Sequence, residues 1–352
     1  MYILLFVYLI TLFYAEVFQQ WNNSSISIKS APRFAYWFCF LIVLFVTIFR
    51  FDVGYDYLTY YENVLHPSDW LYHNWEPISV FFVKLCGFFQ SPLLFFGIYG
   101  FAILFAIYKI IERYSISPFD SAIIFLSLYW LGSLSTMRQY LACAVLFWGI
   151  RYIRQKALLK YIICVIVACC SHYTAIIGIA IYFLYNIKNP RKMVYILLIG
   201  VLILIIALRP YLASIEIDKY QVYLDNMTEM NKGGSKIKLF YYALYAVSFI
   251  ILYLKKGNTD IESFRYLAVI TPSLAFVALL GAQTGFRLGS YFTLYYLLLY
   301  PRLFHLHMKT RWPAQVYLLV FCLYFILLLI VDANNDQGYT NYQFYFLKNL
   351  MQ

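Results

Sequence analysis

Charge is scarce in this chain: only 12% of its 352 residues are Asp, Glu, Lys or Arg, whereas a soluble domain has about 25%. Hydrophobic residues instead make up 63% of the chain, and the mean hydropathy is +0.70. So little charge excludes an ordinary soluble protein. Several apolar runs approach the roughly 20 residues that cross a bilayer as a helix. The composition therefore predicts an all-α, polytopic integral membrane protein, with residues 1–352 forming a single transmembrane domain.

The sequence also lacks the short motifs of many enzymes and binding proteins. It contains no Asp-x-Asp pair, Walker loop, Gly-x-Ser-x-Gly elbow or HExxH motif, so it predicts neither a metal ion nor a nucleotide cofactor. Its seven cysteines lie in apolar runs without zinc-ligand spacing, which favours small buried side chains over a disulfide framework. The net charge of +11 comes without a nucleic-acid-binding motif, so nucleic acid is not an expected partner.

The apolar runs predict about 12 transmembrane helices, within a range of roughly 11 to 14. The first run lacks a basic flank and a small-residue cleavage site, so we expect a retained span and not a signal peptide. Residues 77–90 contain Lys84 and end at Ser91-Pro92, which favours a short re-entrant or interfacial helix. The expected spans lie near residues 1–18, 33–49, 92–111, 118–134, 139–155, 158–171, 173–187, 193–208, 237–254, 265–282, 288–303 and 313–331.

Basic residues indicate how these spans are oriented, because cytoplasmic loops are enriched in Lys and Arg. Six loop clusters hold 17 of the 27 Lys and Arg residues, and alternation of the spans puts them all on one side. The opposite side then receives outer loops near 50–76 and 209–236, turns at Arg138, His172 and Arg287, and the segment 332–352, which together hold 11 of the 16 acids. The sequence therefore predicts that almost every unusual polar residue lies at the outer face.

The densest polar group directly follows an apolar run, in the segment RFDVGYDYLTYYENV at 50–64. Polar groups at the end of a membrane helix are costly unless they meet water, a partner or a substrate. This predicts a site at Arg50, Asp52, Gly54, Asp56 and Tyr60.

Three arginines reach the outer face from separate helix ends: Arg50, Arg138 and Arg287. A guanidinium group binds anionic oxygens bidentately and stays charged. We therefore predict that the three bind one pyrophosphate group at the lipid–water boundary. The alternative is that each arginine extends to the interface or pairs with a nearby acid.

Three residues are candidates for a general base. Asp52 and Asp56 are four positions apart and would share one face of a helix, although they also suit the roles of neutralising Arg50 and capping the next helix. His172 belongs to the residue type best suited to proton transfer near neutral pH, although a lone histidine in an apolar stretch is more often structural. Dense tyrosines in the outer segments favour a saccharide or another polar amphiphile as ligand, because aromatic rings stack on sugar rings.

Five segments of the chain, taken in order, resemble the EpsG family of bacterial membrane proteins, which is related to the Wzy-type O-antigen and exopolysaccharide polymerases. They are RFDVGYDYLTYY, NWEPISVFF, MRQYLACAVLFWGIRYI, HYTAIIGIAIYFLY and FRLGSYF. Each segment is short, but their order and spacing from about residue 33 to residue 303 are much more specific than any one of them.

The resemblance implies a GT-C-like membrane glycosyltransferase of the bacterial inner membrane, active on its periplasmic side. Such a polymerase joins oligosaccharide repeat units carried on undecaprenyl pyrophosphate, needs no cofactor, and has a chain-length regulator protein as a potential further partner. The family's R-x-x-x-G-x-D-x-x-x-Y pattern and its other recurrent polar positions correspond here to Arg50, Gly54, Asp56, Tyr60, Arg138, His172 and Arg287, with Asp52 inside the pattern.

Three other functions are compatible with parts of this pattern. A transporter or flippase of lipid-linked oligosaccharide would favour polar residues at mid-membrane and often an internal repeat, and the sequence has neither. An O-acyltransferase would use a membrane histidine with a cytoplasmic donor, whereas His172 is expected on the outer side. A ligase that transfers finished polymer to another lipid is not separated from a polymerase by the sequence.

Overall fold

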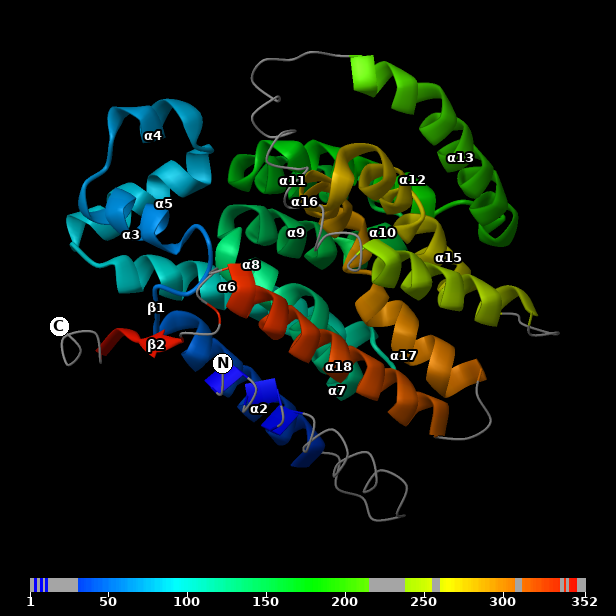
Figure 1. The fold of residues 1–352 in the computed structure, drawn as a ribbon, viewed down its shortest axis with the longest axis horizontal. Helices are drawn as coiled ribbons and strands as arrows, with labels where there is room; N and C mark the ends of the chain where they lie inside the picture. Colours follow the sequence, from blue (N-terminus) through cyan, green and yellow to red (C-terminus); the bar gives the residue numbers. More distant parts are fainter. Residues whose placement is uncertain are drawn as a thin grey trace. The chain divides into compact units, whose positions relative to one another are not determined.

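The structure is a computed structural model that describes residues 3–4, 7–8, 10–11, 31–214, 238–254, 260–307, 312–335, 339 and 342–346. Within these ranges the chain is helical, apart from short connections and one antiparallel pairing of β1 (Arg50–Phe51) with β2 (Gln343–Phe344) (Figure 1). Its contacts divide the chain into two compact units. The first comprises Met1–Trp148, Ile166–Ala175 and Thr310–Gln352, and the second comprises Gly149–Val165 and Ile176–Lys309.

The first unit is a helical bundle whose elements begin where proline and polar capping residues favour it. Pro77, Pro92 and Pro118 each stand at the start of a helix, where their missing N–H has no helical partner to lose. The helices are α2 (Ala31–Ile48), α3 (Tyr57–Leu65), α4 (Asp69–Asn74), α5 (Pro77–Phe88), α6 (Pro92–Tyr114), α7 (Pro118–Phe125), α8 (Leu131–Ser135), α9 (Met137–Trp148) and α18 (Trp312–Asn335), with a π-turn at Leu126–Trp130 between α7 and α8.

Hydrogen bonds between buried polar side chains fix how these helices pack. The Nε1–H of the fully buried Trp130 donates to Thr47 Oγ1 at 3.0 Å, which joins the π-turn to α2. The Tyr317 hydroxyl of α18 donates to the buried Asp120 carboxylate of α7 at 2.8 Å. Such bonds satisfy groups that would otherwise be costly in an apolar interior.

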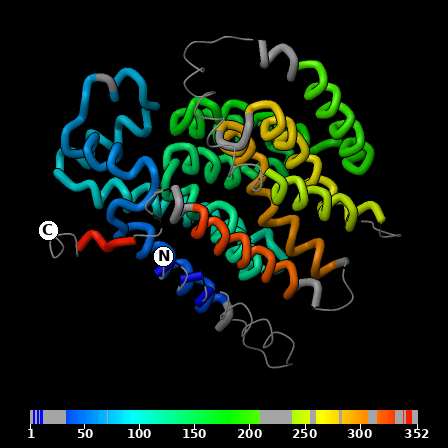
Figure 2. The backbone as a smooth tube through the Cα atoms, viewed as in Figure 1, coloured from blue at the N-terminus to red at the C-terminus, as the bar shows by residue number. Residues whose placement is uncertain are grey.

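The C-terminal segment packs against the turn that follows α2. Figure 2 shows the red β2 segment beside the blue backbone around β1. The hydroxyl of Tyr342 donates to the Val46 carbonyl at 2.6 Å, and that of Tyr339 donates to the Leu131 carbonyl at 2.9 Å. Both tyrosines are buried, so these two rings are part of the core, and the tyrosine-rich tail is at least partly a packing element.

The second unit contains a helix that folds back on itself. A Cβ atom added to Gly285 would lie 2.5 Å from the Phe276 carbonyl oxygen, and the Phe276 and Phe292 rings stack at 5.9 Å. Nine residues of straight helix would span about 13 Å, so the helix must reverse direction between these positions.

The helices of this unit are α10 (Ile150–Arg154), α12 (Ile179–Tyr185), α13 (Pro190–Ser214), Lys238–Leu254, α15 (Ile261–Ile270), the folded-back α16 (Ser273–Thr293) and α17 (Tyr296–His307). The residues of the helix α11 (Leu158–Ser171) and of the 3₁₀ segment Tyr173–Gly178 are divided between the two units, with Ile166–Ala175 in the first.

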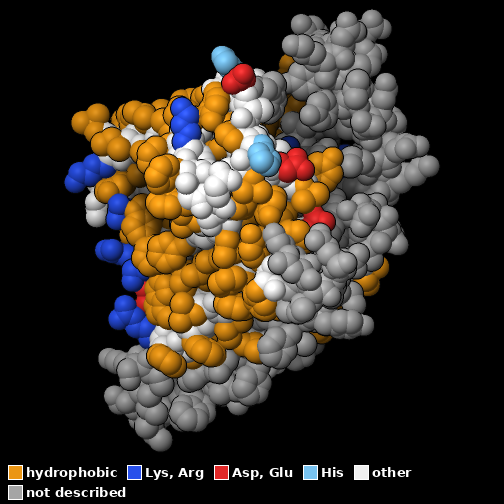
Figure 3. Space-filling view, turned by 90° about the vertical axis from the view of Figure 1, so that its left-hand side faces the viewer, with side chains coloured by type: hydrophobic (Ala, Val, Ile, Leu, Met, Phe, Trp, Pro, Cys, Tyr) orange, Lys and Arg blue, Asp and Glu red, His pale blue; other side chains and the backbone are white. Residues whose placement is uncertain are grey.

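The described surface of the molecule is suited to contact with lipid. Figure 3 shows a face covered mainly by hydrophobic side chains, with Lys and Arg gathered along one margin. Large apolar residues such as Phe34 and Phe88 are 75% and 83% exposed, which a soluble monomer seldom tolerates over a wide area.

Three described stretches are long and apolar enough to cross a membrane by length and composition: Pro92–Tyr114, Pro190–Leu208 and Ile261–Leu280. Shorter apolar helices occupy Arg33–Ile48, Leu158–Ser171, Tyr173–Tyr185, Lys238–Leu254 and Gln315–Val331. The all-helical prediction is confirmed, whereas about 12 spans and a GT-C-like fold stay predictions. The expected span at 1–18 lies mostly outside the described residues.

Two segments can be compared with the expectation in detail, the helix at 77–90 and the outer loop at 209–236. The helix α5 has 12 residues, which gives about 18 Å and is too short for a hydrocarbon core of about 30 Å, as a re-entrant or interfacial helix requires. The outer loop expected at 209–236 begins inside a helix, because α13 continues to Ser214. The rest of that loop lies outside the described residues.

Candidate functional site

A carboxylate, a guanidinium group and an imidazole meet in the first unit. Arg138 Nη1 lies 2.6 Å from Glu76 Oε2, and His172 Nδ1 lies 2.7 Å from Glu76 Oε1. The Glu76 side chain is only 4% exposed, whereas those of Arg138 and His172 are 24% and 27% exposed. The acid is therefore enclosed by its two partners, and both partners remain in part accessible.

Each member of this Glu76–Arg138–His172 cluster is placed by the end of a helix. Glu76 is the N-cap residue of α5 with extended backbone, and its side chain makes no capping bond, which leaves the carboxylate for other partners. Arg138 lies in the first turn of α9, two residues after Thr136, which is the C-cap residue of α8. His172 follows the last residue of α11, where its N–H donates to the Ala168 carbonyl at 2.8 Å.

Aromatic side chains position Arg138 further. The guanidinium carbon lies 4.3 Å from the centroid of the Trp75 ring, and the Trp75 and Tyr60 rings meet edge to face at 5.6 Å. Both rings are buried. A cation held over an aromatic face is stabilised most where water is excluded, so Trp75 limits the positions that the Arg138 side chain can take.

The charges around Glu76 keep it ionised. Burial alone raises the pKa of this carboxyl group, but the hydrogen bond with His172 and the positive charge of Arg138 outweigh burial and lower the pKa below its usual 4.5. With Nδ1 bonded to a carboxylate, a neutral imidazole carries its proton on that nitrogen, which leaves Nε2 with a lone pair. The cluster can thus orient a base and present a cation within one small region.

Arg50, predicted to bind an anion, is instead enclosed by the protein. It is 0% exposed, its Nε donates to the Val53 carbonyl at 3.1 Å, and its Nη2 donates to the Leu134 carbonyl at 3.1 Å. Its Nη1 donates to the Thr47 carbonyl. This geometry gives a ligand no access to Arg50, so it favours a structural role over the predicted anion site.

The turn that carries the predicted site also packs tightly against α8. Gly54 has φ +101°, and a Cβ there would lie 2.8 Å from the Leu134 carbonyl oxygen, so only glycine fits this position. Asp52 is exposed with φ +50°, and Asp56 is half-buried at the N-cap of α3. Tyr60 connects this segment to the cluster, because its hydroxyl interacts electrostatically with both Arg138 and Asp56.

Arg287 belongs to the second unit, where it lies on the returning half of α16 and is exposed. The predicted turn at this residue agrees with the reversal of α16, although the whole stretch is helical. A pyrophosphate site shared by three arginines stays a prediction.

Sequence reasoning missed Glu76 as a site residue and described it only as the end of an outer loop. Its partners lie 62 and 96 residues further along the chain, so no local spacing connects them. The sequence did offer one signal, the Glu-Pro dipeptide. The proline marks the start of a helix, and a glutamate that is buried directly before it needs a polar or charged partner.

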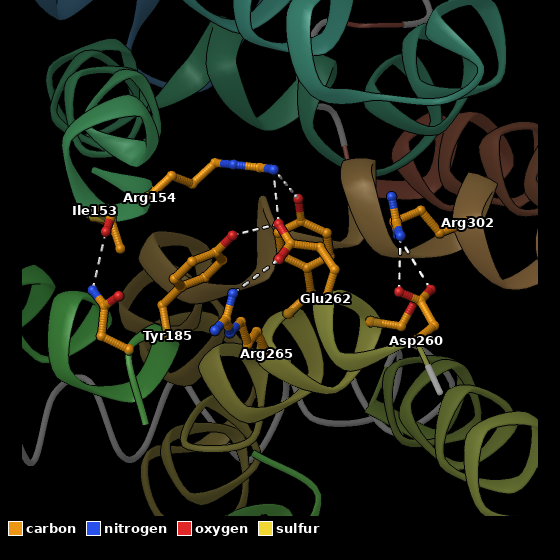
Figure 4. Close-up of polar contacts among 10 residues, drawn as sticks. Ile153, Arg154, Tyr185, Asp260, Glu262, Arg265 and Arg302 are labelled. Carbon is orange, nitrogen blue, oxygen red and sulfur yellow. Dashed lines mark hydrogen bonds and ion pairs between the residues drawn. The ribbon is translucent and has the colours of Figure 1, made fainter. Parts of the chain in front are cut away.

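The second unit contains a separate ionic network, shown in Figure 4. Glu262 accepts from Arg154 at 2.8 Å and from Arg265 at 3.4 Å, and it is also hydrogen-bonded to the Tyr185 hydroxyl. Asp260 pairs with Arg302 at 2.8 Å. These contacts join α10, α12, α15 and α17, and each acid already has its partners among neighbouring helices, which is the arrangement of a structural network.

The chain has long apolar helices, a surface suited to contact with lipid, and a buried carboxylate bound to arginine and histidine at helix ends. These features define a helical membrane protein with a polar site. The model of the EpsG family matches residues 33–344, and the chain belongs to this family. The resemblance expected from the five segments is confirmed. No curated protein sequence and no solved structure matched the chain.

Proposed function

We propose that this protein is a polysaccharide polymerase that joins lipid-linked oligosaccharide repeat units by glycosyl transfer. Membership of the EpsG family supports a polymerase-type function in exopolysaccharide or O-antigen synthesis. The substrate in this proposal is an oligosaccharide carried on undecaprenyl pyrophosphate in the bacterial inner membrane. The reaction takes place at the periplasmic face. In the topology derived from the loop charges, this face receives the outer loops, and the six basic clusters lie on the other side.

The observation that carries this proposal is the Glu76–Arg138–His172 cluster, which lies within the segment matched by the family. Glycosyl transfer from a pyrophosphate requires a cation for the leaving group and a base for the acceptor hydroxyl. Arg138 and His172 supply these two chemical types, and both are partly exposed. Arg287 and the exposed Asp52 are further candidates to contact substrate.

The aromatic residues of the outer loop support a saccharide ligand only in part. Tyr60 and Trp75 are buried and hold Arg138. Tyr55 is 68% exposed, so its ring is accessible for stacking on a sugar ring. Tyr72 is 36% exposed, and the Lys84 ammonium lies 4.8 Å from the centroid of its ring.

A reconstituted assay tests the proposal. Purified protein in lipid vesicles receives the lipid-linked repeat unit and no nucleotide sugar, and the expected product is a ladder of oligomers that differ by one repeat. Movement of the lipid-linked unit across the bilayer without oligomers would instead identify a flippase. Transfer of preformed polymer to a different lipid, without growth of the ladder, would identify a ligase.

A further inference from the structure

We propose that His172 is the general base of the reaction, that Glu76 orients it, and that Arg138 fixes Glu76. This inference rests on the proposed polymerase function and decides among three residues that the sequence leaves equal, namely His172, Asp52 and Asp56. It also assigns Glu76, which no motif singled out, as a positioning residue.

The geometry separates His172 from the two aspartates. Glu76 Oε1 lies 2.7 Å from His172 Nδ1, so the carboxylate fixes both the ring orientation and the tautomer, and Nε2 becomes the acceptor of a proton. The second oxygen of Glu76 is bonded to Arg138 at 2.6 Å, so the acid cannot turn away from the ring. Asp52 is exposed on a turn and Asp56 is part-exposed at the N-cap of α3, so water competes with a substrate hydroxyl for the oxygens of both.

The chemical step balances without a metal ion or a cofactor. The acceptor sugar hydroxyl loses its proton to His172 Nε2 as its oxygen forms a bond to the anomeric carbon of the growing chain. The bond between that carbon and the pyrophosphate oxygen breaks, and its electron pair leaves with the lipid pyrophosphate. The imidazolium ion that forms is stabilised by the negative charge of Glu76, and it returns its proton to water or to the leaving phosphate.

The charges around the ring decide what the removal of one of them does. Glu76 from α5 and Arg138 from α9 carry charge, and the hydroxyls of Tyr60 from α3 and Tyr99 from α6 interact electrostatically with Arg138. In Glu76→Gln the imidazolium ion that forms during the reaction loses its neighbouring anion, so kcat should fall by about 10-fold while KM changes little.

The experiment compares six variants in the reconstituted polymer assay: His172→Asn, His172→Ala, Glu76→Gln, Asp52→Asn, Asp56→Asn and the control His73→Ala. His172→Asn keeps an N–H donor for Glu76 but has no basic nitrogen, so it should fold and lose about 100-fold or more in rate. His172→Ala should regain activity when imidazole is added, which a purely structural histidine would not show. His73→Ala is the matched control, because His73 is exposed on α4 and its Nδ1 lies 2.8 Å from the Asp69 carbonyl of the same helix.

The outcomes separate this inference from the proposed function. No polymer from the wild-type protein overturns the polymerase assignment, and this inference with it. Wild-type polymerisation with near-normal rates in His172→Asn overturns the assignment of the base alone. An unchanged kcat in a folded Glu76→Gln protein overturns the role of Glu76. A loss in Asp52→Asn or Asp56→Asn that matches the loss in His172→Asn would transfer the base to that aspartate.

Discussion

The replacement of Arg50 by lysine tests whether this arginine stabilises the fold or binds substrate. All three guanidinium nitrogens donate to backbone carbonyls, and the guanidinium carbon lies 4.9 Å from the centroid of the Phe96 ring. A lysine ammonium is a single centre, so it cannot reach Val53, Thr47 and Leu134 together.

The expected magnitude follows from these contacts. Charged hydrogen bonds contribute about 1.5–3 kcal/mol each, and Arg50→Lys should lose about two of them. The free energy of unfolding should fall by about 3–5 kcal/mol, which is within the cost of disrupting a buried charged group. In a chain of 352 residues that corresponds to a fall of roughly 4–7 °C in apparent Tm.

Thermal unfolding of the purified protein in detergent measures this effect, and Arg138→Lys is the matched control. Arg138 is 24% exposed and bonded to one acid, so its lysine variant should melt close to the wild type yet lose at least about 10-fold in polymerisation. If Arg50→Lys melts like the wild type but makes no polymer, Arg50 binds substrate and its structural assignment is wrong.

Four further predictions concern metal ions, pH, the second unit and topology. Polymerisation should continue in the presence of a chelator, because arginine can hold the leaving group; complete loss restored by a divalent ion would contradict this. The stabilisation due to ionised Glu76 should be constant above about pH 5 and disappear as the pH falls below 4.5, because its folded pKa is lowered; the difference in Tm between the wild type and Glu76→Gln, measured from pH 6 to pH 3.5, should shrink accordingly. Glu262→Gln should lower the free energy of unfolding by about 2 kcal/mol, since two arginines lose a charged partner, and polymerisation per folded molecule should be unchanged. A cysteine at the exposed Tyr55 should react with an impermeant reagent in intact cells and a cysteine at Gly257 should be protected, in a protein without native cysteines; the reverse pattern would invert the topology.

Helix positions could be predicted from the sequence because the apolar runs and their boundaries are local signals. Ser91-Pro92 marks the start of α6, and the interruption at His172 falls where α11 gives way to a 3₁₀ segment. The reversal near Gly285 was also expected, although as a turn between two helices. These features depend on residues that are neighbours in the chain.

The candidate site was only half predictable, because its contacts join distant residues. Arg138 and His172 were recognised as polar residues at helix ends, but nothing in the sequence indicates that both bind Glu76. The sequence also placed Arg50 in the predicted anion site, because a single motif does not reveal whether a side chain is buried. Its enclosure depends on α8 and on Phe96 of α6, which come together only in the folded unit.

The charge of the site during the proposed reaction gives a reason for its composition. Before the reaction, Glu76 and Arg138 neutralise each other, so neither buried charge lacks a partner. When His172 takes the acceptor proton, the cluster gains one positive charge at the moment when negative charge develops on the departing pyrophosphate. The same proton transfer therefore activates the acceptor and strengthens the attraction for the leaving group. This coupling requires that Glu76 stay ionised, which explains why an arginine and not a neutral donor holds its second oxygen.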